Sequence, residues 1–170
     1  MHLNIGSGRE TQRLHAAGWV TIDPDPLAGA TICAAVPPLP PDVLSERWQV
    51  VEMVHFIEHI YHRDAVELVT AVYQILEPGG MLIMEQPNLE YAAKALLGMI
   101  STDEKPRPFH DMYAFYGDQN GNPYYQHLWG YTPQSMTEML IGAGFQHENI
   151  QIKTAVYHWP WRDFRVEATR

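Results

Sequence analysis

The sequence predicts an α/β protein built on a mostly parallel seven-stranded sheet, with an antiparallel terminal strand and an aromatic-rich lid insertion. Short apolar runs alternate with helical patterns through the first half of the chain, which favours parallel strands joined by right-handed crossovers. Two strand-like runs near the C-terminal end would add an antiparallel edge. Between these parts, residues 87–130 form a segment that is too long for a simple connection.

The composition limits the classes of protein to consider. A chain of 170 residues predicts one domain, 1–170. With 20 acidic against 11 basic residues, the net charge of −9 argues against bulk binding of nucleic acid or an anionic membrane. The single cysteine, Cys33, excludes an internal disulfide. Since the sequence has neither a membrane-length apolar run nor a secretory signal pattern, we expect a cytoplasmic protein.

Strands are expected where apolar and β-branched residues lie between turn residues. The first run ends in the glycine turn Gly6-Ser7-Gly8, and the second ends at Asp23, where two following prolines forbid continuation. The predicted strands are 3–5, 19–22, 30–35, 49–54, 81–85, 150–156 and 164–168.

Helices are expected where apolar residues recur at helical spacing next to capping residues. Asp64 is the predicted N-cap of one helix, and Thr132 with Pro133 forms a typical N-cap and first-turn pair for another. The predicted helical segments are 9–17, 42–46, a short piece within 55–62, 65–76 and 133–141.

Residues 87–130 are interpreted as a substrate lid. The segment is rich in tyrosine, and it follows the C-terminal end of a predicted strand, where open α/β sheets bind ligands. The alternative is an aromatic extension of the core or a dimer face, so a homodimer is also considered.

The glycine turn and Asp23 together indicate a nucleoside-type ligand. A strand, a Gly-x-Gly turn and a helix present backbone N–H groups to a ligand, and glycine permits its close approach. Thr11 replaces the third glycine of the dinucleotide fingerprint, which argues against a pyrophosphate there. Asp23, at the end of the second strand, can accept hydrogen bonds from both hydroxyls of a ribose, although an Asp before proline also suits a simple turn.

Several stretches, taken in order, resemble the class I S-adenosylmethionine (SAM)-dependent methyltransferases, in particular small predicted methyltransferases of the methyltransferase type 11 kind. The matching stretches are LNIGSG, GWVTID, WQVVEMVHFIEHI, LEPGGMLIMEQPN, HLWGYTPQSMTEMLIGAGF and RDFRVEA. The resemblance implies a Rossmann-like fold, methyl transfer and SAM as cofactor.

The resemblance also assigns cofactor-binding residues. Gly6, Ser7 and Gly8 would lie against the methionine part of SAM, Asp23 with Pro24 nearby would bind the ribose, and His55 would lie close to the cofactor. The chain departs from its relatives in three ways: alanines 34 and 35 stand where many have an acid, Gln49 stands where an Asp is common, and the usual N-terminal helices are absent.

The segment His55-Phe56-Ile57-Glu58-His59 allows more than one interpretation. It fits the H-x-x-E-H pattern of zinc peptidases, but it begins at a strand end rather than within a helix. It also resembles the E-x-x-E-H metal element of ubiquinone-pathway and small-RNA O-methyltransferases. By that resemblance Glu58, His59 and His127 would hold a divalent metal, and His55 as a fourth ligand would favour a metal softer than Mg²⁺. In the metal-free alternative, Glu58 and His59 only form local hydrogen bonds.

The sequence therefore favours a SAM-dependent methyltransferase that O-methylates a small molecule or a glycan hydroxyl. His55, His59 and His127 are the candidate catalytic residues, since a hydroxyl nucleophile needs a base or a metal. Two alternatives stay open. One is a catalytically inactive or cofactor-binding module of the same fold that acts through a partner, and the other is an enzyme that consumes the cofactor without a methyl acceptor.

Overall fold

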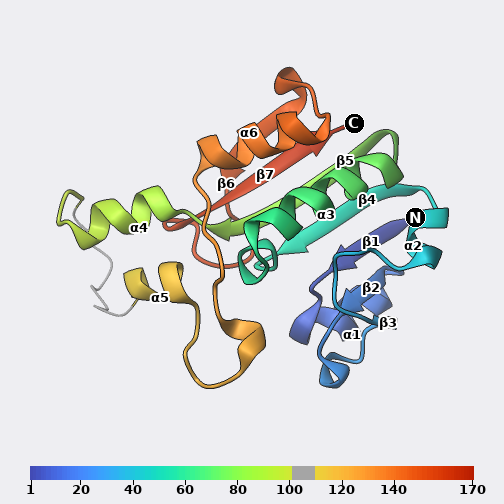
Figure 1. The fold of residues 1–170 in the computed structure, drawn as a ribbon, viewed down its shortest axis with the longest axis horizontal. Helices are drawn as coiled ribbons and strands as arrows, with labels where there is room; N and C mark the ends of the chain where they lie inside the picture. Colours follow the sequence, from blue (N-terminus) through green and yellow to red (C-terminus); the bar gives the residue numbers. More distant parts are fainter. Residues whose placement is uncertain (101–109) are drawn as a thin grey trace.

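The computed structural model describes residues 1–100 and 110–170 and has the predicted α/β architecture (Figure 1). A seven-stranded sheet has the order β3-β2-β1-β4-β5-β7-β6, in which β1 to β5 are parallel and β7 is antiparallel to both β5 and β6. The strands are β1 (His2–Ile5), β2 (Val20–Asp23), β3 (Ile32–Cys33), β4 (Trp48–Val54), β5 (Leu76–Pro87), β6 (Ile150–Thr154) and β7 (Asp163–Thr169). The α-helices are α1 (Thr11–Ala16), α2 (Pro41–Ser45), α3 (His62–Ile75), α4 (Leu89–Leu96), α5 (His110–Tyr116) and α6 (Pro133–Ala143).

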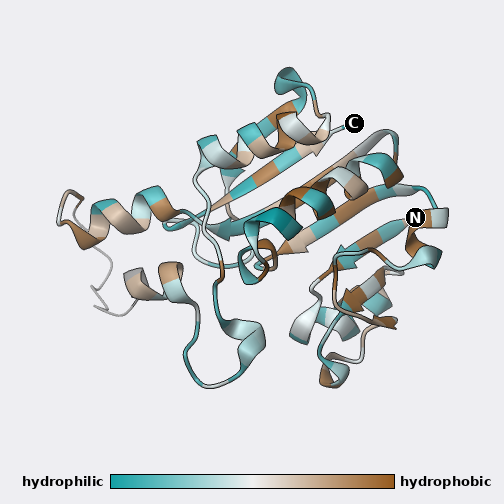
Figure 2. Ribbon diagram, in the orientation of Figure 1, coloured by the Kyte–Doolittle hydropathy of each residue, from teal (hydrophilic) through white to brown (hydrophobic). Residues whose placement is uncertain are grey.

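The two faces of the sheet differ in polarity. The register places Leu3 beside Val51 and Val51 beside Leu82, and these residues belong to one buried apolar cluster that includes side chains of α3 and α6. Hydrophobic and hydrophilic residues alternate along α3, as expected of a helix with one buried face (Figure 2). Because successive strand residues point to opposite faces, the neighbouring pair Asn4 and Glu52 lies on the other face. That face is polar at the centre of the sheet.

The segment between β5 and α6 contains the predicted lid, of which residues 101–109 lie outside the described part. It includes α4 and α5, and in Figure 1 α4 projects away from the sheet. Its two ends meet, because Leu89 donates its N–H to the Tyr131 carbonyl at 2.9 Å. The segment is thus an insertion whose two ends lie side by side at the C-terminal end of β5.

Several elements differ from the sequence prediction. Strand β5 spans Leu76–Pro87 rather than 81–85, because Leu76 already pairs with Trp48 of β4 and Pro87 still pairs with Asp163 of β7. The third strand is reduced to Ile32–Cys33, because it pairs only with β2 at the sheet edge and a proline-rich stretch follows it. Helix α3 begins at His62 with Tyr61 as N-cap, so Asp64 lies in the first helical turn and is not the cap. None of the helices in the described ranges is long and apolar enough to cross a membrane.

We expect Thr132→Ala to lower the free energy of unfolding by about 1 kcal/mol, measured by urea denaturation. The Thr132 side chain accepts the Ser135 N–H, and the Ser135 side chain accepts the Thr132 N–H, which forms a capping box at the start of α6. Gln134→Ala in the same turn is the control, because Gln134 is exposed and takes no part in the box. An equal loss in both variants would contradict this role of the cap.

Candidate functional site

The glycine turn after β1 is held against β2. Gly6 donates its N–H to the Ile22 carbonyl at 2.8 Å, and Gly8 donates its N–H to the Asp23 carboxylate at 2.8 Å. Gly6 has a positive φ of 81°, and a side chain there would collide with the ring of Phe56. The turn therefore needs glycine both for its backbone conformation and for its close packing.

Asp23 and the turn form one side of a cavity. Asp23 is buried, at 7% exposure, and its carboxylate also accepts the Asp25 N–H at 2.9 Å. These two backbone donors fix the carboxylate, and each oxygen keeps a further lone pair for a ligand. Pro24 and Ala35 line the same space of about 680 Å³, which we call the Asp23 cavity.

A second cavity of about 720 Å³, which we call the His127 cavity, meets the first at the glycine turn. Ser7 lines this second cavity, and its hydroxyl pairs with that of Thr11 at 2.8 Å. The residues that line both cavities are Gly6, Gly8, Arg9, His55, His59 and Tyr125. The predicted cofactor residues and the predicted catalytic histidines thus lie around two adjoining spaces.

His55 lies immediately after β4 in a left-handed backbone conformation, with a φ of 48°. Its Nδ1–H donates to Glu58 at 3.0 Å, and its Nε2 forms an ion pair with Asp163 at 3.1 Å. Burial lowers the pKa of His55, but the two carboxylates outweigh this effect and raise the pKa to about 9. The two carboxylates therefore favour the imidazolium form of His55, in which neither nitrogen has a lone pair for a metal or a proton.

Glu58 is 1% exposed and faces three histidines. Burial raises the pKa of its carboxyl, but His55 outweighs this effect and lowers the pKa to about 2. Its Oε1 accepts from His55, whereas its Oε2 is buried and has no hydrogen-bond partner among the described residues. A carboxylate oxygen in this position is suited to a ligand that brings a donor or a cation.

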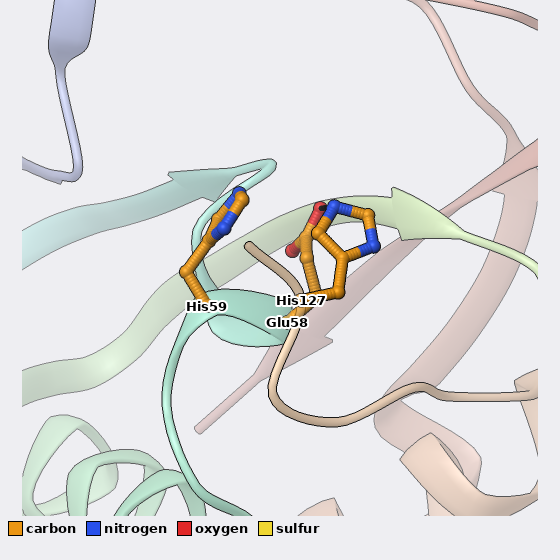
Figure 3. Close-up of side chains that lie close together, drawn as sticks. All are labelled: Glu58, His59 and His127. Atoms are coloured by element: carbon orange, nitrogen blue, oxygen red, sulfur yellow. Dashed lines mark ion pairs between the residues drawn. The ribbon is translucent and has the colours of Figure 1, made fainter. Parts of the chain in front are cut away.

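The side chains of His59 and His127 lie close to Glu58 (Figure 3), and their rings meet edge to face with centroids 4.9 Å apart. His59 donates Nδ1–H to the Gln126 carbonyl at 2.9 Å, and His127 donates Nδ1–H to the Ala114 carbonyl at 3.1 Å. Each neutral ring then keeps a lone pair on Nε2, an arrangement that is common in metal-binding histidines. Burial lowers the pKa of His127, which favours the neutral ring. One ligand atom from each of the three residues lies within 4.8 Å of the others.

The structure brings together the three predicted metal ligands, and it places His55 between Glu58 and Asp163. Because Glu58 and Asp163 occupy both nitrogens of His55, a set of four ligands that includes His55 does not form. Three neighbours of the site were missed in the sequence: Asp163, and the pair Asn4 and Glu52 in the His127 cavity. The sequence signal for Glu52 is an acidic residue within the apolar run 49–54, where a charged side chain is uncommon.

The comparisons agree with this geometry at the level of fold. The chain is similar to a SAM-dependent methyltransferase from Archaeoglobus fulgidus, with a TM-score of 0.67 and 15% identity over 99% of this chain and 85% of that one. It is also similar to a SAM-dependent methyltransferase from Thermotoga maritima, described as a possible histamine N-methyltransferase, with a TM-score of 0.64 and 13% identity over 99% and 81% of the chains. A third match is the plantazolicin methyltransferase in complex with S-adenosylhomocysteine (SAH), with a TM-score of 0.62 and 13% identity over 99% and 75%.

No family model matches the sequence, and a search of curated proteins finds no match. At these low identities the likeness is one of fold: the chain has the Rossmann-like fold of SAM-dependent methyltransferases, which confirms the predicted fold class.

The stability of the metal-free protein should depend on the charge of His55. Because its folded-state pKa is raised from 6.5 to about 9, its contribution is fully present below about pH 6.5 and is lost as the pH rises through about 9. In a chelator, we expect the free energy of unfolding to fall by about 3 kcal/mol across this window. His55→Gln should remove this dependence, and His147→Gln, an exposed control, should keep it. The same pH slope in His55→Gln would contradict the assignment.

Proposed function

We propose that the protein is a SAM-dependent methyltransferase that methylates a hydroxyl group of a small molecule or a glycan. The observation that supports this most is the meeting of the two cavities at the glycine turn. One cavity presents a fixed carboxylate, Asp23, and the other presents histidines with free lone pairs. The likeness in fold to methyltransferases, including one described as a putative O-methyltransferase, is consistent with it.

The Asp23 cavity has the features that an adenosine needs. The Asp23 carboxylate would accept hydrogen bonds from the two ribose hydroxyls, and Pro24, Ala35 and Val36, which line the cavity, would offer apolar contacts to the adenine ring. Around Gly8 there is open space that a side chain would fill, so the sulfur end of the cofactor has room beside the turn. These residues fit SAM, which supplies an activated methyl group when it is bound.

The reaction requires an acceptor oxygen aligned behind the methyl group, with water excluded. In this proposal the acceptor lies in the His127 cavity, and the segment 87–130 acts as a lid through Tyr113 and Tyr125, which line that cavity. The neutral Nε2 of His127 accepts the hydroxyl proton while the Ala114 carbonyl holds the other side of the ring. His55 positions Glu58 and does not exchange protons with the acceptor, because both its nitrogens are occupied.

We further propose that Glu58, His59 and His127 can hold a divalent cation. The unpartnered Oε2 of Glu58 and the two anchored imidazoles fit this role. A cation bound there would lower the pKa of an acceptor hydroxyl. His127 would then be a ligand and not the base, so the two roles of His127 are alternatives that an experiment separates.

Asp23→Asn should weaken binding of SAM and SAH by about tenfold or more, measured by calorimetric titration. The amide NH₂ replaces one of the two carboxylate oxygens proposed to bind the ribose. One of the two backbone N–H groups, of Gly8 or of Asp25, then loses its acceptor. Asp42→Asn, on the exposed side of α2, is the matched control and should bind like the wild type. If the folded wild-type protein bound neither compound, the proposed function would be wrong.

The cation is tested by titrating the chelator-treated protein with Mn²⁺ and with Zn²⁺. We expect one site in the wild type and its loss in Glu58→Gln and in His127→Ala, while His147→Gln keeps it. If the wild type bound neither ion and methyl transfer were unaffected by chelator, His127 would be assigned as the base.

A further inference from the structure

Arg162 is a buried cation at the wall of the His127 cavity. It lies directly before β7, it is 3% exposed, and it lines this cavity. Its Nε donates a hydrogen bond to the carboxylate of Asp163. No other residue of the described ranges accepts a hydrogen bond from its guanidinium group. Because an arginine carries five N–H donors, the donors that Asp163 does not use remain for a ligand in the cavity.

The acid that pairs with Arg162 is shared with another cation. The Oδ2 of Asp163 lies 3.1 Å from the Nε2 of His55, and its Oδ1 accepts from Arg162. His55 has a second carboxylate in Glu58, whereas Arg162 has no second acid among the described residues. A further anion would therefore complete the hydrogen bonding of the Arg162 guanidinium.

Arg165 shows how an arginine is bound when its role is structural. Its Nη1 donates to Glu85 at 2.9 Å and its Nε donates to Glu167 at 2.7 Å, so two carboxylates bind one guanidinium group. Arg165 lines neither the His127 cavity nor the Asp23 cavity. The chain itself thus supplies the anions for Arg165, whereas it places Arg162 at a cavity with one shared acid.

Trp159 fixes the orientation of the Arg162 guanidinium. The Cζ of Arg162 lies 4.2 Å from the centroid of the Trp159 ring, a cation–π contact. A tight turn holds the two residues together, since Arg162 and Asp163 donate their N–H groups to the Trp159 carbonyl at 2.9 and 2.8 Å. The ring covers one face of the guanidinium and leaves the N–H groups in its plane. A planar group held in this way matches the two oxygens of a carboxylate.

The acids that line the same cavity interact with other groups. Glu10 forms an ion pair with Arg13 at 2.8 Å, and Glu52 also interacts electrostatically with Arg13. Asp118 is exposed and accepts hydrogen bonds from a neighbouring asparagine. In the described part of the chain, none of these three acids forms an ion pair with Arg162. The anion that this cation can still bind would therefore come with a ligand.

We propose that the methyl acceptor carries a carboxylate besides the hydroxyl that is methylated, and that Arg162 binds this carboxylate. The inference rests on the proposed function and names the class of its substrate, a hydroxy acid. The carboxylate is bound and not changed by the reaction. A row of ion pairs from Glu58 through His55 and Asp163 connects the acceptor hydroxyl at one end with the acceptor carboxylate at Arg162.

The test compares acceptors that differ in this charge. The protein saturated with SAH is titrated calorimetrically with 4-hydroxybenzoate against 4-hydroxybenzamide, and with glucuronate against glucose. We expect the carboxylate of at least one pair to bind about tenfold or more tightly than its neutral partner, because a charge-assisted bidentate contact replaces a neutral one. The aromatic pair represents a small molecule and the sugar pair represents a glycan, so the two arms distinguish these sources.

Variants assign the preference to one residue. Arg162→Gln should remove the preference for the carboxylate, and Arg162→Lys should keep part of it, because lysine retains the charge but not the planar group. Arg63→Gln, an exposed position on α3 outside both cavities, is the matched control and should bind like the wild type. Arg9→Gln tests the exposed arginine that lines both cavities. Binding of SAH reports that each variant is folded.

The outcomes separate this inference from the proposed function. If the protein bound SAH but bound neither carboxylate more tightly than its neutral partner, the inference alone would be wrong. The same holds if the preference survived in Arg162→Gln or was lost in Arg9→Gln instead. If the wild type bound neither SAM nor SAH, the proposed function would fail, and the inference with it. Loss of the preference in Arg162→Gln, with SAH binding intact, would support the inference.

Discussion

The geometry of the candidate site depends on the two ion pairs that His55 forms, one with Glu58 and one with Asp163. His55 follows β4, Asp163 begins β7, and Glu58 lies in the turn after β4, so one imidazolium joins two strand ends. The backbone carbonyl of Glu58 in turn accepts the N–H groups of Leu128 and Trp129. This contact brings His127 beside Glu58 although the two residues are 69 positions apart in the sequence. The strained backbone of His55 is thus compensated by contacts that assemble the site.

The unequal faces of the sheet explain where the cavities can form. Helices α3 and α6 cover one face with a continuous apolar cluster. On the other face, Leu14 of α1 lines a cavity together with Asn4 and Glu52. A buried polar row is destabilising unless it is paired. In this row the Asn4 amide and the Tyr157 hydroxyl both donate to Glu52.

The fold could be predicted because its signals are local. Apolar runs, glycine turns and the Thr132 cap each act within a few residues, and together they determined the strands and most helices. The site was predictable where a motif is contiguous, as in His55 to His59. The partners of these residues were not predictable, since Asp163 and Gln126 reach the site only through the sheet topology and the path of the insertion. The pairing of Asn4 with Glu52 requires the register of two parallel strands, which no single segment encodes.

The occupied nitrogens of His55 also bear on what kind of metal site this can be. Four protein ligands around a cation leave no position for a substrate, as in structural zinc sites, whereas three ligands leave positions open. Because His55 lies between Glu58 and Asp163, the group in the described part of the chain that could hold a cation consists of Glu58, His59 and His127. One carboxylate with two imidazoles is a harder ligand set than one carboxylate with three imidazoles. Such a set suits manganese or iron as well as zinc. With His55 held by two carboxylates, the proposed cation would have three protein ligands and would keep open positions for an acceptor hydroxyl.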